Sequence, residues 1–76
     1  MLRRFVKFVF NKEEVTRVID SLSAYGTIRV NSVKDGKTYS VSMYCKTDEL
    51  QRCLDSILTL SRDGVWIRKL DVQYKV

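Results

Sequence analysis

The sequence contains no histidine, the side chain that enzymes most often use to transfer protons at neutral pH. Neither a Ser-His nor a Cys-His nucleophile pair is therefore present. Glycine is also scarce, and Gly26, Gly36 and Gly64 stand far apart, so there is no glycine-rich loop to hold a phosphate group. The residues that common active sites require are missing.

The aspartates and glutamates show no arrangement typical of a catalytic acid or base. Most lie in predicted first helical turns or three to four residues from a basic side chain, as Glu13 does with Arg17 and Asp48 with Arg52. Pairs at this spacing are typical of solvated helix surfaces. We therefore expect a protein that is not an enzyme, with no catalytic residues and no cofactor.

Only two cysteines are present, Cys45 and Cys53. A structural zinc site normally needs four cysteine or histidine ligands, so a metal site of that type is excluded and we expect no metal. The pair has two interpretations, a disulfide or redox couple and two buried thiols in a reducing compartment. We favour the second, because Cys53 falls on the apolar stripe of a predicted helix, and we expect the protein to be cytoplasmic.

No apolar run approaches the ~20 residues that a membrane span requires, so no membrane association is expected. The start, Met1–Val6, has the basic character of a signal peptide, but its apolar stretch is short and Lys7 interrupts it. We interpret it as a strand. The 76 residues are expected to form one soluble domain, residues 1–76.

Four segments have the pattern of strands. Residues 2–10 alternate between apolar and polar positions, and the stretches 28–31, 38–45 and 65–76 continue the series. Asp35-Gly36 between the second and third strands favours a two-residue hairpin turn. The last strand changes parity midway, which predicts a β-bulge near Arg68 and Lys69 that places Trp66 on the solvent face.

Two segments have the pattern of helices, residues 11–25 and 47–63. Asn11 with Glu14 predicts a capping box, Thr47 predicts the second cap, and Gly26 ends the first helix. Each helix carries one apolar face at helical spacing. The predicted buried stripes are Val15, Val18, Ile19 and Leu22 in the first helix, and Leu50, Cys53, Leu54, Ile57 and Leu58 in the second.

The order β-α-β-β-α-β predicts the α+β class, with a two-layer sandwich of a four-stranded antiparallel sheet and two helices on one face. Over the whole chain this order resembles the ferredoxin-like fold, which RNA-recognition motifs and ACT-like regulatory domains share. The fold hosts many activities, so the resemblance implies an architecture and not a function.

One segment of the chain can be compared with a characteristic motif of each of these two families. Residues 37–44 resemble the RNP1 octamer of RNA-recognition motifs at Lys37, Tyr39 and Tyr44. That alignment requires Tyr39 to be exposed, whereas the alternation of the strand places it towards the core. ACT-like domains commonly hold an effector at a glycine-containing turn after the first strand, and the corresponding Phe10-Asn11-Lys12 has no glycine.

The charge is unevenly distributed. The net charge is +5, yet acidic residues outnumber basic ones in both predicted helices, so the strands and turns carry most of the 14 lysines and arginines. Strand parity places a basic and aromatic set on the face away from the helices. The candidate binding residues are Arg3, Phe5, Lys7, Arg29, Tyr44, Trp66, Arg68 and Lys69.

This set leaves two hypotheses open. The first is a non-enzymatic module that binds single-stranded nucleic acid or another polyanion, because cations neutralise phosphates and aromatic rings stack on bases. The alternative is a protein–protein adaptor or an oligomerising ACT-like domain, such as a homodimer, that uses the same face or a strand edge.

Overall fold

The computed structural model describes residues 3–33 and 36–75. Six main elements follow one another in the predicted order, and each strand begins and ends within two residues of its predicted bounds. No helix in the described part of the chain is long and apolar enough to cross a membrane. The elements are β1 (Arg3–Asn11), α1 (Val15–Leu22), β2 (Ile28–Ser32), β3 (Thr38–Lys46), α2 (Leu50–Arg62) and β4 (Ile67–Lys75).

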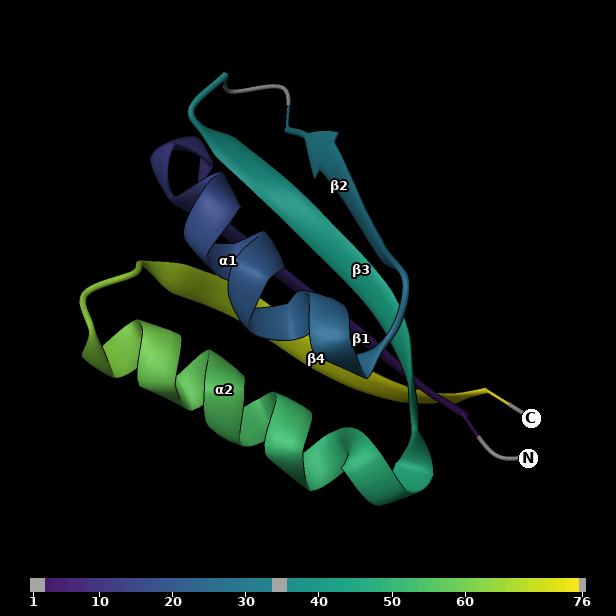
Figure 1. Cartoon of the computed structure of the whole chain (residues 1–76). Helices are drawn as coiled ribbons and strands as arrows, with labels where there is room; N and C mark the ends of the chain where they lie inside the picture. The colour runs from purple at the N-terminus through teal and green to yellow at the C-terminus, as the bar shows by residue number, and fades with distance from the viewer. Residues whose placement is uncertain (1–2, 34–35, 76) are drawn as a thin grey trace.

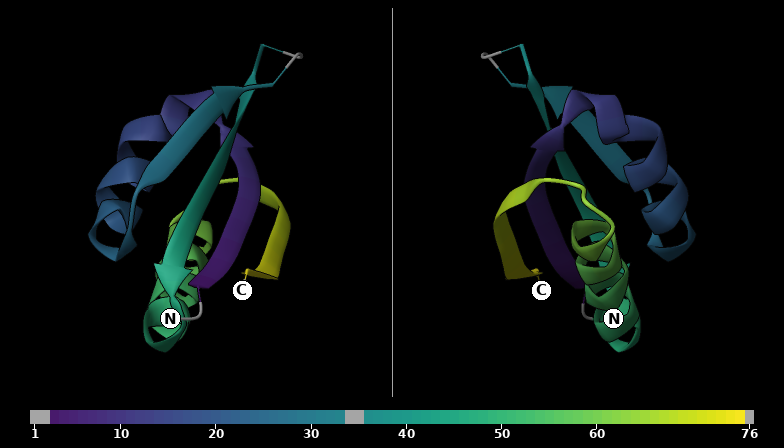
Figure 2. Two further views of the ribbon diagram at one scale, coloured as in Figure 1. Left: turned by 90° about the vertical axis from the view of Figure 1, so that its right-hand side faces the viewer. Right: turned by 90° about the vertical axis from the view of Figure 1, so that its left-hand side faces the viewer.

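The strands form one antiparallel sheet in the order β2-β3-β1-β4. Both helices lie on the same side of it, α1 nearer β2 and α2 nearer β4 (Figures 1 and 2). This arrangement is the predicted two-layer α+β sandwich with ferredoxin-like topology. The opposite face of the sheet carries no helix, and β2 and β4 are its edges.

The core lies between the sheet and the helices. Cross-strand partners share a face, and the pairs Phe8 with Val41 and Val6 with Met43 place four buried side chains under the helices. This confirms the predicted inner positions of β1 and β3. The buried side chains are Val6, Phe8, Phe10, Val18, Leu22, Val41, Met43, Cys45, Cys53, Ile57, Leu60 and Val65.

Of the predicted helix stripes, Val15, Leu50 and Leu54 are partly buried against this core, and two residues are exposed. Ile19 is 38% exposed and Leu58 is 50% exposed, so both predictions were wrong. Leu60 and Val65 are buried in their place, next to the point where α2 turns into β4. Helical spacing identifies an apolar face, but the width of the buried strip depends on which strands lie beneath it.

The helix starts also differ from the predicted caps. Both helices open with a 3₁₀ turn, Lys12–Glu14 and Thr47–Glu49, and Asn11 makes no side-chain capping bond. Glu14 accepts a 3.2 Å hydrogen bond from Arg17 instead of closing a capping box, and Thr47 lies inside its turn. The predicted turn at Asp35-Gly36 falls partly on residues 34–35, which lie outside the described residues.

The β-bulge in the last strand is present. Val9 pairs with Arg68 and Lys7 with Asp71, so β4 has one residue more than β1 between these pairs. Lys69 adopts φ 58°, the left-handed conformation that such insertions commonly use. The extra residue reverses the parity of β4, which is why Ile67 and Val72 both lie on the helix side although their spacing is odd.

Cys45 and Cys53 are both free and buried, and Cys53 Sγ donates to Met43 Sδ over 3.8 Å. Burial raises the pKa of both thiols, that of Cys53 from 9.0 to about 12. The protonated thiol is a poor nucleophile. We therefore expect neither cysteine to react with a thiol reagent at pH 8 in the native protein, while both react after denaturation; fast native labelling would contradict this burial.

A folded-state pKa above the unfolded value also makes stability depend on pH. The contribution of Cys53 is constant below pH 9 and is lost as the pH rises towards 12, at up to ~1.4 kcal/mol per pH unit. Urea unfolding between pH 8 and 11 measures the slope. Cys53→Ala provides the control, and its slope is expected to be shallower than that of the unmodified protein.

Candidate binding face of the sheet

The uncovered side of the sheet brings together residues from all four strands. Phe5 pairs with Tyr44, Lys7 pairs with Ser42, and Arg29 of β2 pairs with Ser42 from the other side. Partners across antiparallel strands point to the same face. We call this surface the basic sheet face, and it consists of Arg3, Phe5, Lys7, Val9, Arg29, Tyr44, Trp66 and Arg68.

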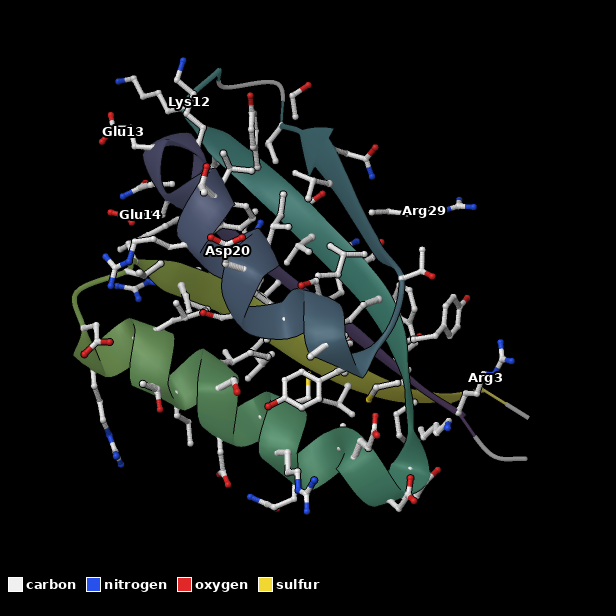
Figure 3. The ribbon with its side chains drawn as sticks, viewed as in Figure 1. Arg3, Lys12, Glu13, Glu14, Asp20 and Arg29 are labelled. Carbon is white, nitrogen blue, oxygen red and sulfur yellow. The ribbon has the colours of Figure 1, made fainter. Side chains whose placement is uncertain are left out.

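The four cations of this face are exposed and lie on β1, β2 and β4. Figure 3 shows Arg3 and Arg29 extending from the strands, on the side of the molecule away from Glu14 and Asp20 of the helical layer. Among the described residues, Asp71, the partner of Lys7, is the one acidic residue on this face, and the others lie in the helical layer, so the face is net positive. Lys69, also a predicted binding residue, is exposed at the bulge, outside the regular alternation of β4.

The aromatic rings of the face are already in contact with neighbours. The centroids of Phe5 and Tyr44 are 5.1 Å apart and their planes are tilted by 56°. The guanidinium carbon of Arg68 lies 5.1 Å from the Trp66 ring centroid, and Arg68 also donates a 3.0 Å hydrogen bond to the carbonyl of Ile67. Each of these rings thus has one side occupied, which was not predictable from parity alone.

Apolar and charged side chains alternate across the face: on β1, Lys7 lies between Phe5 and Val9, and it pairs with Ser42 of β3 and Asp71 of β4. Phe5 and Val9 are half-buried, and Tyr44 and Trp66 expose substantial ring area. Two hollows flank Tyr44: one of about 350 Å³ includes Arg3, and one of about 360 Å³ includes Phe5 and Arg29 in its walls. Aromatic residues and arginine are enriched in protein interfaces, so this mixture of side chains suits one.

Gly26 fixes the position of the chain beside Tyr44. A Cβ atom at Gly26 would overlap the carbonyl oxygen of Tyr44, so only glycine permits this close approach. The sequence indicated Gly26 as a helix stop, and the structure shows this further role. The contact holds the corner before β2 against β3 and so forms one wall of the hollow next to Tyr44.

Besides the two hollows on the sheet face, a third concavity, which the sequence did not predict, lies between the two helices. It has a volume of about 670 Å³, and the hydroxyls of Tyr25 and Ser56 are hydrogen-bonded within it at 3.0 Å. Arg17 contacts Glu14 at 3.2 Å and Asp63 at 4.0 Å. The predicted partner of Arg17 was Glu13, which was wrong: the guanidinium binds Glu14, three residues before it, and also approaches Asp63 at the end of α2.

The described residues contain no group of three or more Cys, Asp or Glu side chains placed to hold a metal ion. In the groove between the helices, the carboxylates of Asp20, Asp55 and Asp63 belong to exposed residues. The basic sheet face, by contrast, combines exposed cations, three aromatic rings and two shallow hollows.

Comparison with known proteins supports the architecture described above. No protein-family model matches the chain, and no curated protein sequence matches it. Among solved structures, it is similar to a protein from Thermus thermophilus that is provisionally described as a PII-like signaling protein. The TM-score is 0.69 at 11% sequence identity, over 100% of this chain and 91% of the other. At that identity the likeness shows that the two chains share a ferredoxin-like fold.

Proposed function

We propose that this protein is a non-enzymatic regulatory or adaptor domain, and that its basic sheet face binds an acidic surface of a protein partner. The observation that carries the proposal is the anatomy of that face. The aromatic pair Phe5 and Tyr44 lies on one side of the central Lys7, and Val9 and Trp66 lie towards the other side. Lys7, Arg29 and Arg68 stand between and beside these apolar residues. Aromatic residues and arginine are the side chains most enriched in the energetic centres of protein interfaces.

The sign of the charge indicates which protein fits. A second copy of the same face would bring Arg3, Lys7, Arg29 and Arg68 against their own counterparts, and like charges across an interface cost several kcal/mol. An acidic surface is complementary and is attracted from a distance. The ferredoxin-like fold that this chain shares with a protein described as PII-like signaling is compatible with a regulatory role, in a reducing cytoplasm that keeps Cys45 and Cys53 as thiols.

Single-stranded nucleic acid is the second candidate, and the row of cations beside Trp66 favours it. The ring geometry favours protein, because Phe5 and Tyr44 pack against each other and Arg68 covers one side of Trp66. Bases stack on ring faces that are free. A fluorescent single-stranded oligonucleotide at two salt concentrations tests this candidate, and Arg29→Ala is expected to reduce the salt slope by about one unit if binding occurs.

Photo-crosslinking from the face distinguishes the two partners. We would place the photoreactive amino acid p-benzoylphenylalanine at Tyr44, with the same substitution at the exposed Thr16 of α1 as a control. In cells that make the protein, irradiation is expected to give a discrete adduct from position 44 alone. The adduct should resist nuclease, be degraded by protease, and disappear when Arg29 and Arg68 are replaced by alanine.

The outcomes are distinct. A nuclease-sensitive adduct from position 44 would replace the proposal with the nucleic-acid candidate. An adduct whose mass is twice that of the chain would show that the sheet face binds itself. The absence of any adduct specific to position 44, or an equal adduct from Thr16, would contradict a binding role for this face.

A further inference from the structure

The edge of the sheet formed by β4 has features that the basic sheet face does not explain. In the described structure β4 is nine residues long and pairs with β1 along one side. Beyond the bulge at Lys69, the pairing from Asp71 onward is regular. The outer side of this stretch presents a row of backbone donors and acceptors that another strand can use.

An apolar patch lies beside this edge on the helix side. Val72 pairs with the buried Val6, so it points towards the helical layer, and Leu70 has the same parity. Leu70 is nevertheless 45% exposed and Val72 is 38% exposed. Leu58 of α2 is 50% exposed and is not among the residues that line the groove between the helices, and α2 is the helix nearer β4 (Figure 1). We call Leu58, Leu70 and Val72 the edge patch.

The opposite edge of the sheet differs. β2 has five residues, and its exposed side chains include Arg29, Asn31 and Ser32. Short length and polar side chains are the usual means by which an edge strand avoids pairing with another chain. β4 has a bulge near one end and charged residues such as Lys69 and Asp71, but it is longer than β2 and also exposes the apolar Leu70 and Val72. The two edges are therefore not equivalent, and β4 is the one suited to pairing.

A second copy of β4 fits this edge in one register. A two-fold axis perpendicular to the sheet keeps the faces of both copies aligned, so opposed residues must share a face. With Val72 opposite Val72, each Asp71 lies opposite Gln73, two side chains that already form a 2.8 Å hydrogen bond within one chain. A register centred on Asp71 opposes two carboxylates at the axis itself, whereas the register centred on Val72 opposes its like-charged residues, Lys69 and Lys75, only at the ends of the paired stretch.

We propose that the protein forms a two-fold symmetric dimer through β4, with antiparallel pairing centred on Val72 and the two edge patches in contact. The result is a continuous eight-stranded sheet with four helices on one face. Both basic sheet faces then lie on the other side, so the dimer presents two copies of the binding face side by side. An acidic partner with two sites would be held more tightly than by one copy.

The dimer is expected to be weak and to become stronger as the salt concentration rises. One strand edge with three apolar side chains is a small interface, so we expect a dissociation constant of about 1–100 µM. Each copy carries +5, so raising the salt concentration screens the repulsion between copies and strengthens the dimer. Binding of an acidic partner by the basic sheet face weakens under the same change, so the two proposals fail or succeed separately.

Sedimentation equilibrium from 1 µM to 1 mM, at low and high salt, measures the association directly. Leu58→Glu and Val72→Lys change the net charge in opposite directions, and both are expected to raise the dissociation constant at least tenfold. Ile19→Glu is the matched control for Leu58→Glu, because Ile19 is also an exposed apolar residue but lies on α1. Tyr44→Glu controls for association through the sheet face, and neither control should weaken the dimer.

The register has its own test. Val72→Cys is expected to form a disulfide between copies under mild oxidation, because equivalent residues at the axis are close enough for a bond. A chain that remains monomeric at 1 mM in high salt would overturn the proposal. A dimer that Leu58→Glu and Val72→Lys leave intact, or one that Tyr44→Glu dissociates, would also overturn it, and a dimer without the Val72→Cys disulfide would overturn the register.

Discussion

Leu22→Ala is expected to lower the free energy of unfolding by about 2–5 kcal/mol, whereas Ile19→Ala should lower it by about 1 kcal/mol or less. The two residues belong to the same apolar stripe of α1, but Leu22 is fully buried and Ile19 is 38% exposed. Removing the Leu22 side chain leaves a cavity between helix and sheet. In a domain of this size, that loss is a large part of the total stability.

Urea denaturation followed by far-ultraviolet circular dichroism measures both changes under one set of conditions. The pair is informative because the substitutions are similar in chemistry and helix propensity, so their difference reports burial. If Ile19→Ala cost as much as Leu22→Ala, the placement of α1 over the sheet would be rotated from the one described.

Trp66→Ala is expected to weaken binding of the protein partner about 30-fold or more, equivalent to about 2 kcal/mol, the range of an interface hot spot. Trp66 offers the largest side chain of the face, and Arg68 lies over it at 5.1 Å. Loss of the ring also leaves Arg68 without its stacking partner, so Arg68→Ala in the Trp66→Ala background should add less than it does alone.

Isothermal titration calorimetry with the crosslinked partner, once purified, gives these affinities. Ile19→Ala serves as the control, because Ile19 is also a large exposed apolar residue but lies on α1, on the other side of the sheet and outside the edge patch. Equal losses from Trp66→Ala and Ile19→Ala would show that the partner does not distinguish the two faces and would refute the assignment of the site.

Most of the fold was predictable because the strand and helix periods are clear. Alternation in β1 and β3 identified the inner face, and the change of parity in β4 predicted the bulge found at Lys69. The exposure of Leu58 was not predictable, because periodicity does not reveal how far α2 lies from β4. The contact of Arg17 with Asp63 was not predictable either, since the two residues are distant in sequence and meet through packing of the helices.

The candidate face was predictable in composition and not in geometry. Parity correctly placed Lys7, Arg29 and Tyr44 together on one side of the sheet. What parity omits is the contacts among these side chains, such as the tilted pair of Phe5 and Tyr44, because rotamers depend on neighbours across strands. Those contacts change the favoured partner from nucleic acid to protein.

Trp66 is the single tryptophan of the chain, so its fluorescence reports directly on the basic sheet face. The most direct measurement of the proposed function is acrylamide quenching of this emission with and without the crosslinked partner, with a partner chosen or altered to contain no tryptophan. A bound protein should cover the exposed part of the ring, lower the quenching constant severalfold and shift the emission to shorter wavelength. If calorimetry detects binding while quenching and emission stay unchanged, the partner binds elsewhere and the basic sheet face is not its site.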